Sequence, residues 1–176
     1  MRDLTGPSQV RAIRDLLQGI FAMEAMKPSK PLWLLSGWIT DIGIIDNRAR
    51  QFNTLDPSWP TAMVPLSAVL RTILERGGGV SIVLREDQHN RYFTDRMRGL
   101  RGEFPQTLRI LLAPDFHEKC LVGTDYVLNG SMNLTYRGVE VNDEHVVFRT
   151  EPSIVAERRL VLATLWGSKL DAATRS

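Results

Sequence analysis

The chain has 176 residues, of which 43% are hydrophobic and 24% are charged, as in ordinary globular proteins; neither a disordered nor a membrane-embedded chain is indicated. This length suits one domain, residues 1–176, with a sizeable core. The formal net charge of +2 neither favours nor excludes nucleic acid, because a basic cleft can lie within a balanced total.

Cys120 is the only cysteine, which excludes an intramolecular disulfide and fits a reducing cytoplasm. We expect it to be a small buried residue and not a reactive thiol. The first eight residues lack a basic segment followed by an apolar one, so a secretory signal is not expected. Residues 32–45, the longest apolar stretch, are too few and too polar to span a bilayer. The expected location is cytoplasmic, without membrane contact.

The first elements along the chain are a helix and a buried strand. Apolar residues recur at three- and four-residue spacing from Ser8, a possible N-cap, to about residue 25. Residues 32–36 then favour a buried strand. Trp38 and Asp41 follow it, at a place where a ligand crevice often opens in an α/β sheet. Either they line the mouth of a site, or Trp38 packs in the core and Asp41 caps a turn.

The middle of the chain predicts a loop at 53–60, a helix at 67–76 and a strand at 80–85. Glycines 77–79 lie between helix and strand, whereas a phosphate-binding glycine loop runs from strand to helix, so we interpret them as a helix stop. Residues 86–101 predict a polar helix with four arginines and two aromatic residues. They could follow a nucleic-acid backbone, although the acidic residues among them favour a solvated face.

The last third predicts a strand at 108–113, a hairpin that includes His117 to Leu128, and a further strand at 146–149. A long closing helix is expected from residue 152, with the charges of residues 156–159 on its outer face. Helices and strands alternate along the whole chain, which favours an α/β sandwich.

Chemistry-bearing residues gather in the hairpin. If 117–119 were a strand, His117 and Lys119 would share one face. Ser131 and Asn133 also stand two apart, and Gly130 would let the chain approach a ligand closely. An imidazole, a cation, a hydroxyl and an amide suit a phosphate ester, because they can attack phosphorus and neutralise its oxygens without a metal ion. The ordinary alternative is a hairpin whose His and Lys face solvent.

The motif resembles the HxK...GSxN signature of the phospholipase D superfamily. The residues on its positions are His117, Lys119, Gly130, Ser131, Asn133 and Thr135. The family usually has an Asp five residues after the Lys, where this chain has Thr124, with Asp125 one further on. The segment from Ser36 to Asp41 resembles a second family segment, S-x-W-I-[ST]-D. The resemblance implies a mixed β-sheet flanked by helices on both faces, over nearly the whole chain.

The resemblance also implies roles for these residues. His117 would be the nucleophile, while Lys119, Asn133 and Ser131 would hold the phosphate, and no cofactor is expected. An acidic residue after GSxN orients the histidine in the family; Glu144 has the favoured position, with Glu140 in reserve. The chain has one motif where the reaction needs two histidines, so the second would come from another copy in a homodimer.

Three functions compete. Small single-motif members resemble bacterial endonucleases, especially the phospholipase D-like proteins that accompany DNA-modification or defence systems such as deazaguanine insertion, so a DNA-cleaving hydrolase is expected. A DNA- or phosphate-binding component of such a system, without cleavage, is the alternative. Hydrolysis of phospholipid head groups is less favoured, because lipid-acting members usually carry two motifs in a longer chain and no interfacial amphipathic segment stands out here.

Overall fold

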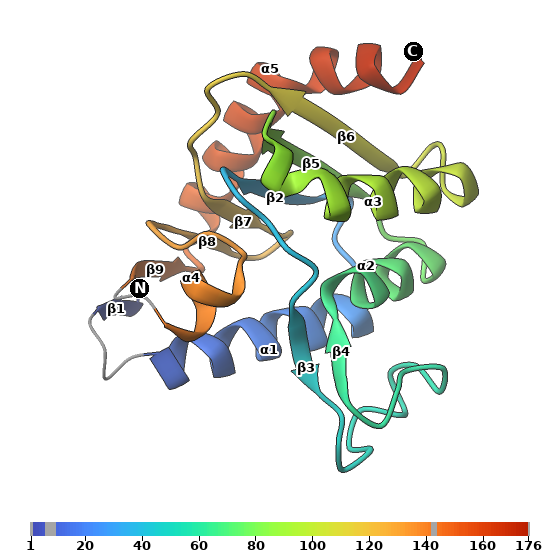
Figure 1. The fold of residues 1–176 in the computed structure, drawn as a ribbon. Coiled ribbons are helices and arrows are strands. Elements are labelled where there is room, and N and C mark those ends of the chain that lie inside the picture. Colours follow the sequence, from blue (N-terminus) through green and yellow to red (C-terminus); the bar gives the residue numbers. More distant parts are fainter. Residues whose placement is uncertain (1, 6–9, 142–143, 176) are drawn as a thin grey trace.

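The computed structural model describes residues 2–5, 10–141 and 144–175. A seven-stranded sheet, in the order β1-β9-β8-β7-β2-β5-β6, forms its centre. The strands are β1 (Arg2–Thr5), β2 (Leu32–Ser36), β5 (Val80–Arg85), β6 (Leu108–Ala113), β7 (Cys120–Val122), β8 (Val127–Gly130) and β9 (His145–Arg149). Strands β2, β5 and β6 are parallel, whereas β7, β8, β9 and β1 pair antiparallel with their neighbours. The sheet is therefore mixed (Figure 1).

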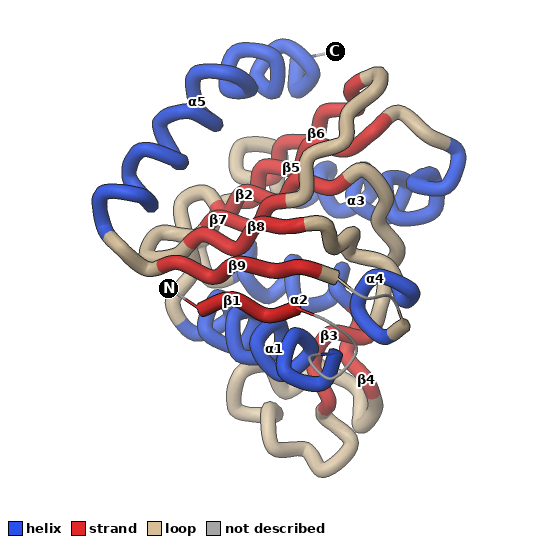
Figure 2. Tube along the Cα trace, turned by 90° about the vertical axis from the view of Figure 1, so that its left-hand side faces the viewer, coloured by secondary structure: helices blue, strands red, loops and turns tan. Residues whose placement is uncertain are grey.

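Helices cover both faces of this sheet. They are α1 (Val10–Met26), α2 (Leu66–Glu75), the short 3₁₀ helix η2 (Gln88–Asn90), α3 (Arg91–Glu103), α4 (Tyr136–Glu140) and α5 (Pro152–Arg175). Figure 2 shows α5 on one side of the strands, with the other helices on the opposite side. The expected α/β sandwich, a mixed sheet with helices on both faces, is confirmed.

Alternation along the buried strands divides the interior into two apolar clusters, one on each face. Leu32 and Leu34 of β2 point toward α1, α2 and α3, and belong to the larger cluster. Trp33 and Leu35, the residues between, point toward α5 and pack with its Val155, Leu162 and Leu170. Because β2 is buried on both faces, all five of its residues are inaccessible, which explains the unbroken apolar run in the sequence.

The helix stop at the glycines is confirmed. Gly77 has a φ of 79°, and the N–H groups of Gly77 and Gly78 donate to the carbonyls of Leu74 and Ile73. A left-handed glycine after the last turn satisfies the free carbonyls of a helix end in this way. The expected cap of α1, Ser8, lies outside the described residues.

Five features differ from the sequence prediction. β1, α4 and a small separate hairpin of β3 (Gly43–Asp46) and β4 (Met63–Pro65) were not expected. His117 to Lys119 do not form a strand, because β7 begins only at Cys120. The charges at 156–159 do not all face outward: Arg158 pairs with Glu118, and Arg159 donates to the carbonyls of Lys30, Pro31 and Gly123.

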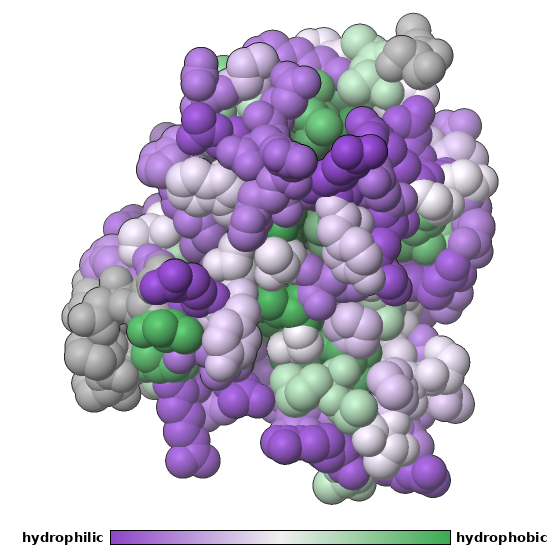
Figure 3. Space-filling model, in the orientation of Figure 1, coloured by the Kyte–Doolittle hydropathy of each residue, from purple (hydrophilic) through white to green (hydrophobic). Residues whose placement is uncertain are grey.

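The surface agrees with the composition. Hydrophilic residues predominate on the face drawn in Figure 3, and apolar residues show mainly in the gaps between them. None of the helices in the described ranges combines the length and the apolar character that a bilayer span requires.

Candidate active site

The motif lies at the carboxyl ends of the three parallel strands. Ser36 ends β2, Arg85 ends β5 and Ala113 ends β6, and the pairing register brings these ends together at one edge of the sheet. The chain then continues from β6 through a turn to His117 and Lys119. Ligands of open α/β sheets bind in the crevice outside such strand ends, so the topology itself favours a site here.

His117 and Lys119 are close without strand alternation. The Lys119 ammonium turns back and donates to the backbone carbonyl oxygen of His117, at 2.6 Å. The His117 side chain is exposed, and its ring meets the Trp38 ring edge to face with the centroids 6.1 Å apart. Partial burial lowers the pKa of Lys119, while the negative charge of Glu144 acts in the opposite direction. The site thus offers an accessible imidazole beside a partly desolvated cation.

Asn133 is fixed by the loop that follows β2. Its side-chain oxygen accepts the backbone N–H of Trp38 at 3.1 Å. The buried Ser36 hydroxyl donates to the Trp38 carbonyl at 2.6 Å and accepts the N–H of Leu134 at 3.4 Å. Because the protein itself uses the amide oxygen, the NH₂ end of Asn133 is the end that can donate to a phosphate.

Gly37 lies beside both Lys119 and Asn133. A methyl group built on Gly37 would lie 3.4 Å from the Asn133 side-chain oxygen and 3.8 Å from the Lys119 nitrogen. The backbone at Gly37 therefore passes close to the cation and to the side chain of Asn133, and no side chain covers them at this position.

Ser131, Glu144 and Gly130 are held together where β8 ends and β9 begins. The Ser131 hydroxyl donates to the carboxylate of Glu144 and accepts the N–H of His145 at 3.0 Å. Glu144 is 8% exposed, and this hydrogen bond joins it to the GSxN segment. A methyl group on Gly130 would lie 1.9 Å from the carbonyl oxygen of His145, so the close approach that requires glycine is to strand β9 and not to a ligand. Within the described ranges, no three His, Cys, Asp or Glu side chains lie together as metal ligands would.

Trp38 lies at the site, half-buried between three charged or polar groups. Its indole N–H donates to the carboxylate of Asp87 at 3.3 Å, and the guanidinium of Arg85 lies over its ring, 5.7 Å from the centroid. The N–H groups of His89 and Trp38 are the leading causes of the lowered pKa of Asp87. The indole is thereby held in one orientation beside His117.

Asp41 lies away from these groups. Its carboxylate accepts both the N–H and the hydroxyl of Ser67, at 2.8 and 2.7 Å, at the start of α2. It also pairs with Arg96 at 3.1 Å, and its side chain is 8% exposed. Of the two roles left open by the sequence, the structure supports capping, since a carboxylate that binds the first N–H groups of a helix stabilises its start.

The two other distinctive motif positions are structural. Thr124, where the family usually has Asp, donates its N–H to the Ser29 hydroxyl at 2.7 Å, while Asp125 pairs with Lys27 at the surface. Thr135 caps α4, because its hydroxyl accepts the N–H of Gly138 at 3.1 Å. Neither residue contacts the His117 side of the site in these hydrogen bonds.

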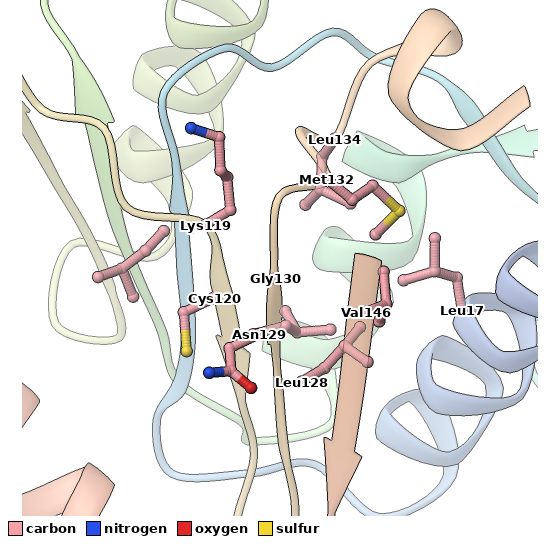
Figure 4. A pocket seen from close by; sticks show the side chains of 11 residues that line it. Leu17, Lys119, Cys120, Leu128, Asn129, Gly130, Met132, Leu134 and Val146 are labelled. Carbon is pink, nitrogen blue, oxygen red and sulfur yellow. The ribbon is translucent and has the colours of Figure 1, made fainter. Parts of the chain in front are cut away.

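A small cavity lies beneath the motif (Figure 4), bounded by residues of α1, β2, β7, β8 and β9. It measures about 20 Å³, close to the space of one water molecule. Figure 4 shows Lys119 and Cys120 extending in opposite directions from the chain. Burial raises the pKa of the Cys120 thiol to about 12, so the expectation of an unreactive core cysteine is confirmed. The cavity is a packing defect and too small for a phosphate ester.

Sequence reasoning missed four residues of the site: Gly37, Arg85, Asp87 and Asn90. Asn90 receives the N–H of Ile39 and donates to the carbonyls of Gly37 and Arg85, so it joins the loops that follow β2 and β5. A glycine beside the expected Trp38 was the one available signal. The other residues lie on a segment whose position only the parallel pairing of β2 and β5 reveals.

Comparisons with known proteins agree with this geometry. A family model described as "Cardiolipin synthase, PLD-like domain" matches residues 52–166. Among solved structures, NucT from Helicobacter pylori superposes with a TM-score of 0.57 and 14% identity, over 98% of this chain and 95% of that one. Nuc from Salmonella typhimurium, described as a phospholipase D family member, gives 0.58 and 16%, over 94% and 93%.

An archaeal chromatin protein, TrmBL2, superposes with a TM-score of 0.54 and 15% identity over 95% of this chain and 52% of its own. A search of curated protein sequences found no match. At such identities the structural likeness concerns the fold, whereas the family model covers well over half of the chain. With the HxK...GSxN residues gathered at one edge of the sheet, the chain belongs to the phospholipase D-like family.

Proposed function

We propose that this protein is a metal-independent phosphodiesterase that cleaves DNA through a covalent intermediate on His117. The observation that carries the proposal is that Lys119 and Asn133 both border Gly37, beside the exposed imidazole of His117. A cation and an amide donor at this place can hold two non-bridging oxygens of a phosphodiester while a ring nitrogen faces phosphorus.

The reaction follows from these roles. The neutral imidazole of His117 attacks phosphorus, a P–N bond forms, and the P–O bond to the leaving oxygen breaks. A general acid protonates that oxygen. Water, deprotonated by the same group, then attacks phosphorus; the P–N bond breaks, and a phosphate monoester leaves. We assign to Lys119 and Asn133 the stabilisation of the negative charge that develops on the phosphate oxygens. The single hydroxyl proton of Ser131 is donated to Glu144, so we assign to this pair the orientation of the motif.

We further propose that the general acid is His117 of a second copy. In-line attack requires the acid on the far side of phosphorus, and neither His89 nor His145 is followed by the motif residues that surround His117. A two-fold symmetric dimer would set the two motifs across one shared cleft.

The side of α5 that borders the motif fits the role of the dimer interface. Arg158, Val161 and Leu165 are three and four residues apart and share one side of the helix. Arg158 pairs with Glu118, between the two motif residues, while Val161 and Leu165 are 36% and 52% exposed. Apolar side chains beside the motif would be buried by a second copy and would hold the two sites close together. Leu165→Glu should then convert a dimer into a less active monomer, as sedimentation and activity measured at one concentration would show.

DNA is the proposed substrate, and a DNA-modification or defence system in the cytoplasm is the proposed setting. TrmBL2, whose fold is similar, is described as an archaeal chromatin protein with a novel mode of DNA binding, which supports a nucleic-acid partner. The test incubates plasmid and single-stranded DNA with the wild type and with His117→Ala in EDTA. Cleavage by the wild type alone is expected; cleavage abolished by EDTA and restored by Mg²⁺ would reject the mechanism. Binding without cleavage by either protein would favour a role as a DNA-binding component.

Mixed dimers test the shared site. Wild-type subunits are mixed with excess His117→Ala subunits, so that most wild-type chains lie in heterodimers. A shared site predicts that activity per wild-type chain falls sharply. Activity proportional to the wild-type chains would show that each chain works alone.

A further inference from the structure

We propose that Arg85 binds a second phosphate of the substrate strand, next to the one attacked by His117, so that the site selects a polynucleotide over an isolated phosphodiester. The inference rests on the proposed function and specifies its substrate class. Arg85 belongs to neither motif segment of the sequence, and its place at the end of β5 is a finding of the structure.

The first step is the position of Arg85. Its guanidinium lies 5.7 Å from the centre of the Trp38 ring, and this ring lies 6.1 Å from that of His117. The guanidinium therefore lies within about 12 Å of the imidazole, a span of three to four nucleotides of one strand at about 3.4 Å each. A strand with one phosphate at His117 can therefore place another of its phosphates, up to three or four nucleotides along, at Arg85.

The second step is the way Arg85 is held. Its backbone carbonyl accepts the side-chain N–H of Asn90 at 2.8 Å, and the Trp38 ring under its guanidinium is itself fixed by Asp87. Stacking on an aromatic face leaves the edge of a guanidinium available for paired hydrogen bonds to phosphate oxygens. The Arg85 side chain is 32% exposed, so part of it is accessible to a ligand.

The third step is its present ionic partner. Arg85 pairs with Asp115 across 3.8 Å, and the Asp115 side chain is 97% exposed. Such an exposed, long ion pair contributes little to stability. A phosphate, which can accept paired hydrogen bonds from the guanidinium at bonding distance, can replace it. Asp115 then acts as a weak competitor for the same cation.

The chemical consequence is a preference for repeated phosphates. A phospholipid has a single phosphodiester near its head group, whereas a DNA strand presents one phosphate per nucleotide. A second phosphate site at fixed distance from His117 therefore increases the affinity for a polynucleotide relative to a substrate with one phosphate.

Salt dependence of binding tests the contact. The dissociation constant of a single-stranded oligonucleotide is measured against salt concentration in a His117→Ala background, which prevents cleavage. Each phosphate contact adds about 0.7 to the slope of log K against log salt for single strands. Arg85→Gln should lower the slope by about this amount, and Arg85→Lys should restore it. An unchanged slope for Arg85→Gln would overturn the proposal. A slope that falls in Arg85→Gln and stays low in Arg85→Lys would also overturn it, since Arg85 would then act by holding Trp38 in place and not by its charge.

Two matched controls sharpen the result. Arg71→Gln removes the same charge from α2, where Arg71 pairs with Glu75 and Glu103, and should leave the slope unchanged. Asp115→Asn removes the competitor and should tighten binding; Asn suits the left-handed backbone at this position, where φ is 53°. Weaker binding by Asp115→Asn would contradict the competition.

Substrate length separates this inference from the proposed function. In the active protein, the loss of kcat/KM caused by Arg85→Gln should grow between a dinucleotide, which has one phosphodiester, and a hexanucleotide. Equal losses on both substrates would refute the second phosphate site while the phosphodiesterase itself stands. A wild-type protein that cleaves no polynucleotide would refute the proposed function instead.

Discussion

Gly37→Ala is expected to abolish phosphate binding without harming the fold. A methyl group at this position would lie 3.4 Å from the Asn133 oxygen, 3.6 Å from the carbonyl oxygen of Phe116 and 3.8 Å from the Lys119 nitrogen. All three are ordinary van der Waals distances, so nothing must move in the free protein. The methyl nevertheless fills the space in which an oxygen bound to Lys119 would lie. Displacing a reacting group by 1 Å can cost about 100-fold in rate, so kcat/KM should fall by about that factor.

The free energy of unfolding of Gly37→Ala should rise, although its activity falls. Gly37 is not among the described glycines with positive φ, and alanine at a compatible position stabilises a protein by about 0.4–1 kcal/mol through the unfolded chain. For a chain of this size that corresponds to a rise in Tm of at most about 4 °C. Gly99→Ala on α3, where a methyl would meet nothing within 4 Å, is the matched control and should keep full activity. A stable Gly37→Ala protein with kcat/KM within about twofold of the wild type would show that the phosphate binds elsewhere.

Three further predictions follow from named contacts. Asp41→Ala removes the cap of α2, so the free energy of unfolding should fall by about 1–2 kcal/mol in thermal unfolding, while activity per folded molecule stays unchanged. A loss of activity at unchanged Tm would instead mean that Asp41 acts in the active site. Arg159→Met removes three hydrogen bonds to backbone carbonyls and should lower the free energy of unfolding in urea by about 2–4 kcal/mol, whereas a change below about 0.5 kcal/mol would mean that water replaces them. Glu144→Gln removes the negative charge that raises the pKa of Lys119. The Lys119 ammonium should then lose its proton at lower pH, and the alkaline fall of kcat/KM should move to lower pH with it. An alkaline fall that stays in place or moves to higher pH would contradict this electrostatic assignment.

Strong periodicity made most of the fold predictable. The apolar spacing of α1, the apolar run of β2 and the largely apolar sequence of β5 reflect burial against a whole layer, which leaves a clear pattern in the sequence. β1, by contrast, has four residues and is held by β9 from the other end of the chain. The hairpin of β3 and β4 is also short, and a long run of turns separates its strands. Short strands gain their stability from distant partners, and a local pattern does not identify those partners.

The local structure of the motif was predicted wrongly for a related reason. Alternation predicted a shared face for His117 and Lys119, yet both precede β7, and Lys119 reaches back to the carbonyl of His117. The positive φ of Asp115 ends the extended conformation before the motif begins. The contact that joins the two residues is therefore the hydrogen bond from the Lys119 ammonium to the His117 carbonyl, which needs no strand.

The decisive part of the site joins residues about a hundred positions apart. The amide of Asn133 is set by the N–H of Trp38, and the same loop leaves the space at Gly37. Ser36 holds that loop to Leu134 from a fully buried position. A hydroxyl buried at a strand end must find hydrogen-bond partners. Here one partner is the carbonyl of Trp38, and the others are Asn133 of the GSxN segment and the N–H of Leu134 that follows it. The segment from Ser36 to Trp38 therefore positions Asn133 of the proposed phosphate site, which explains why two separate stretches of sequence resemble one family although only one of them carries the proposed nucleophile.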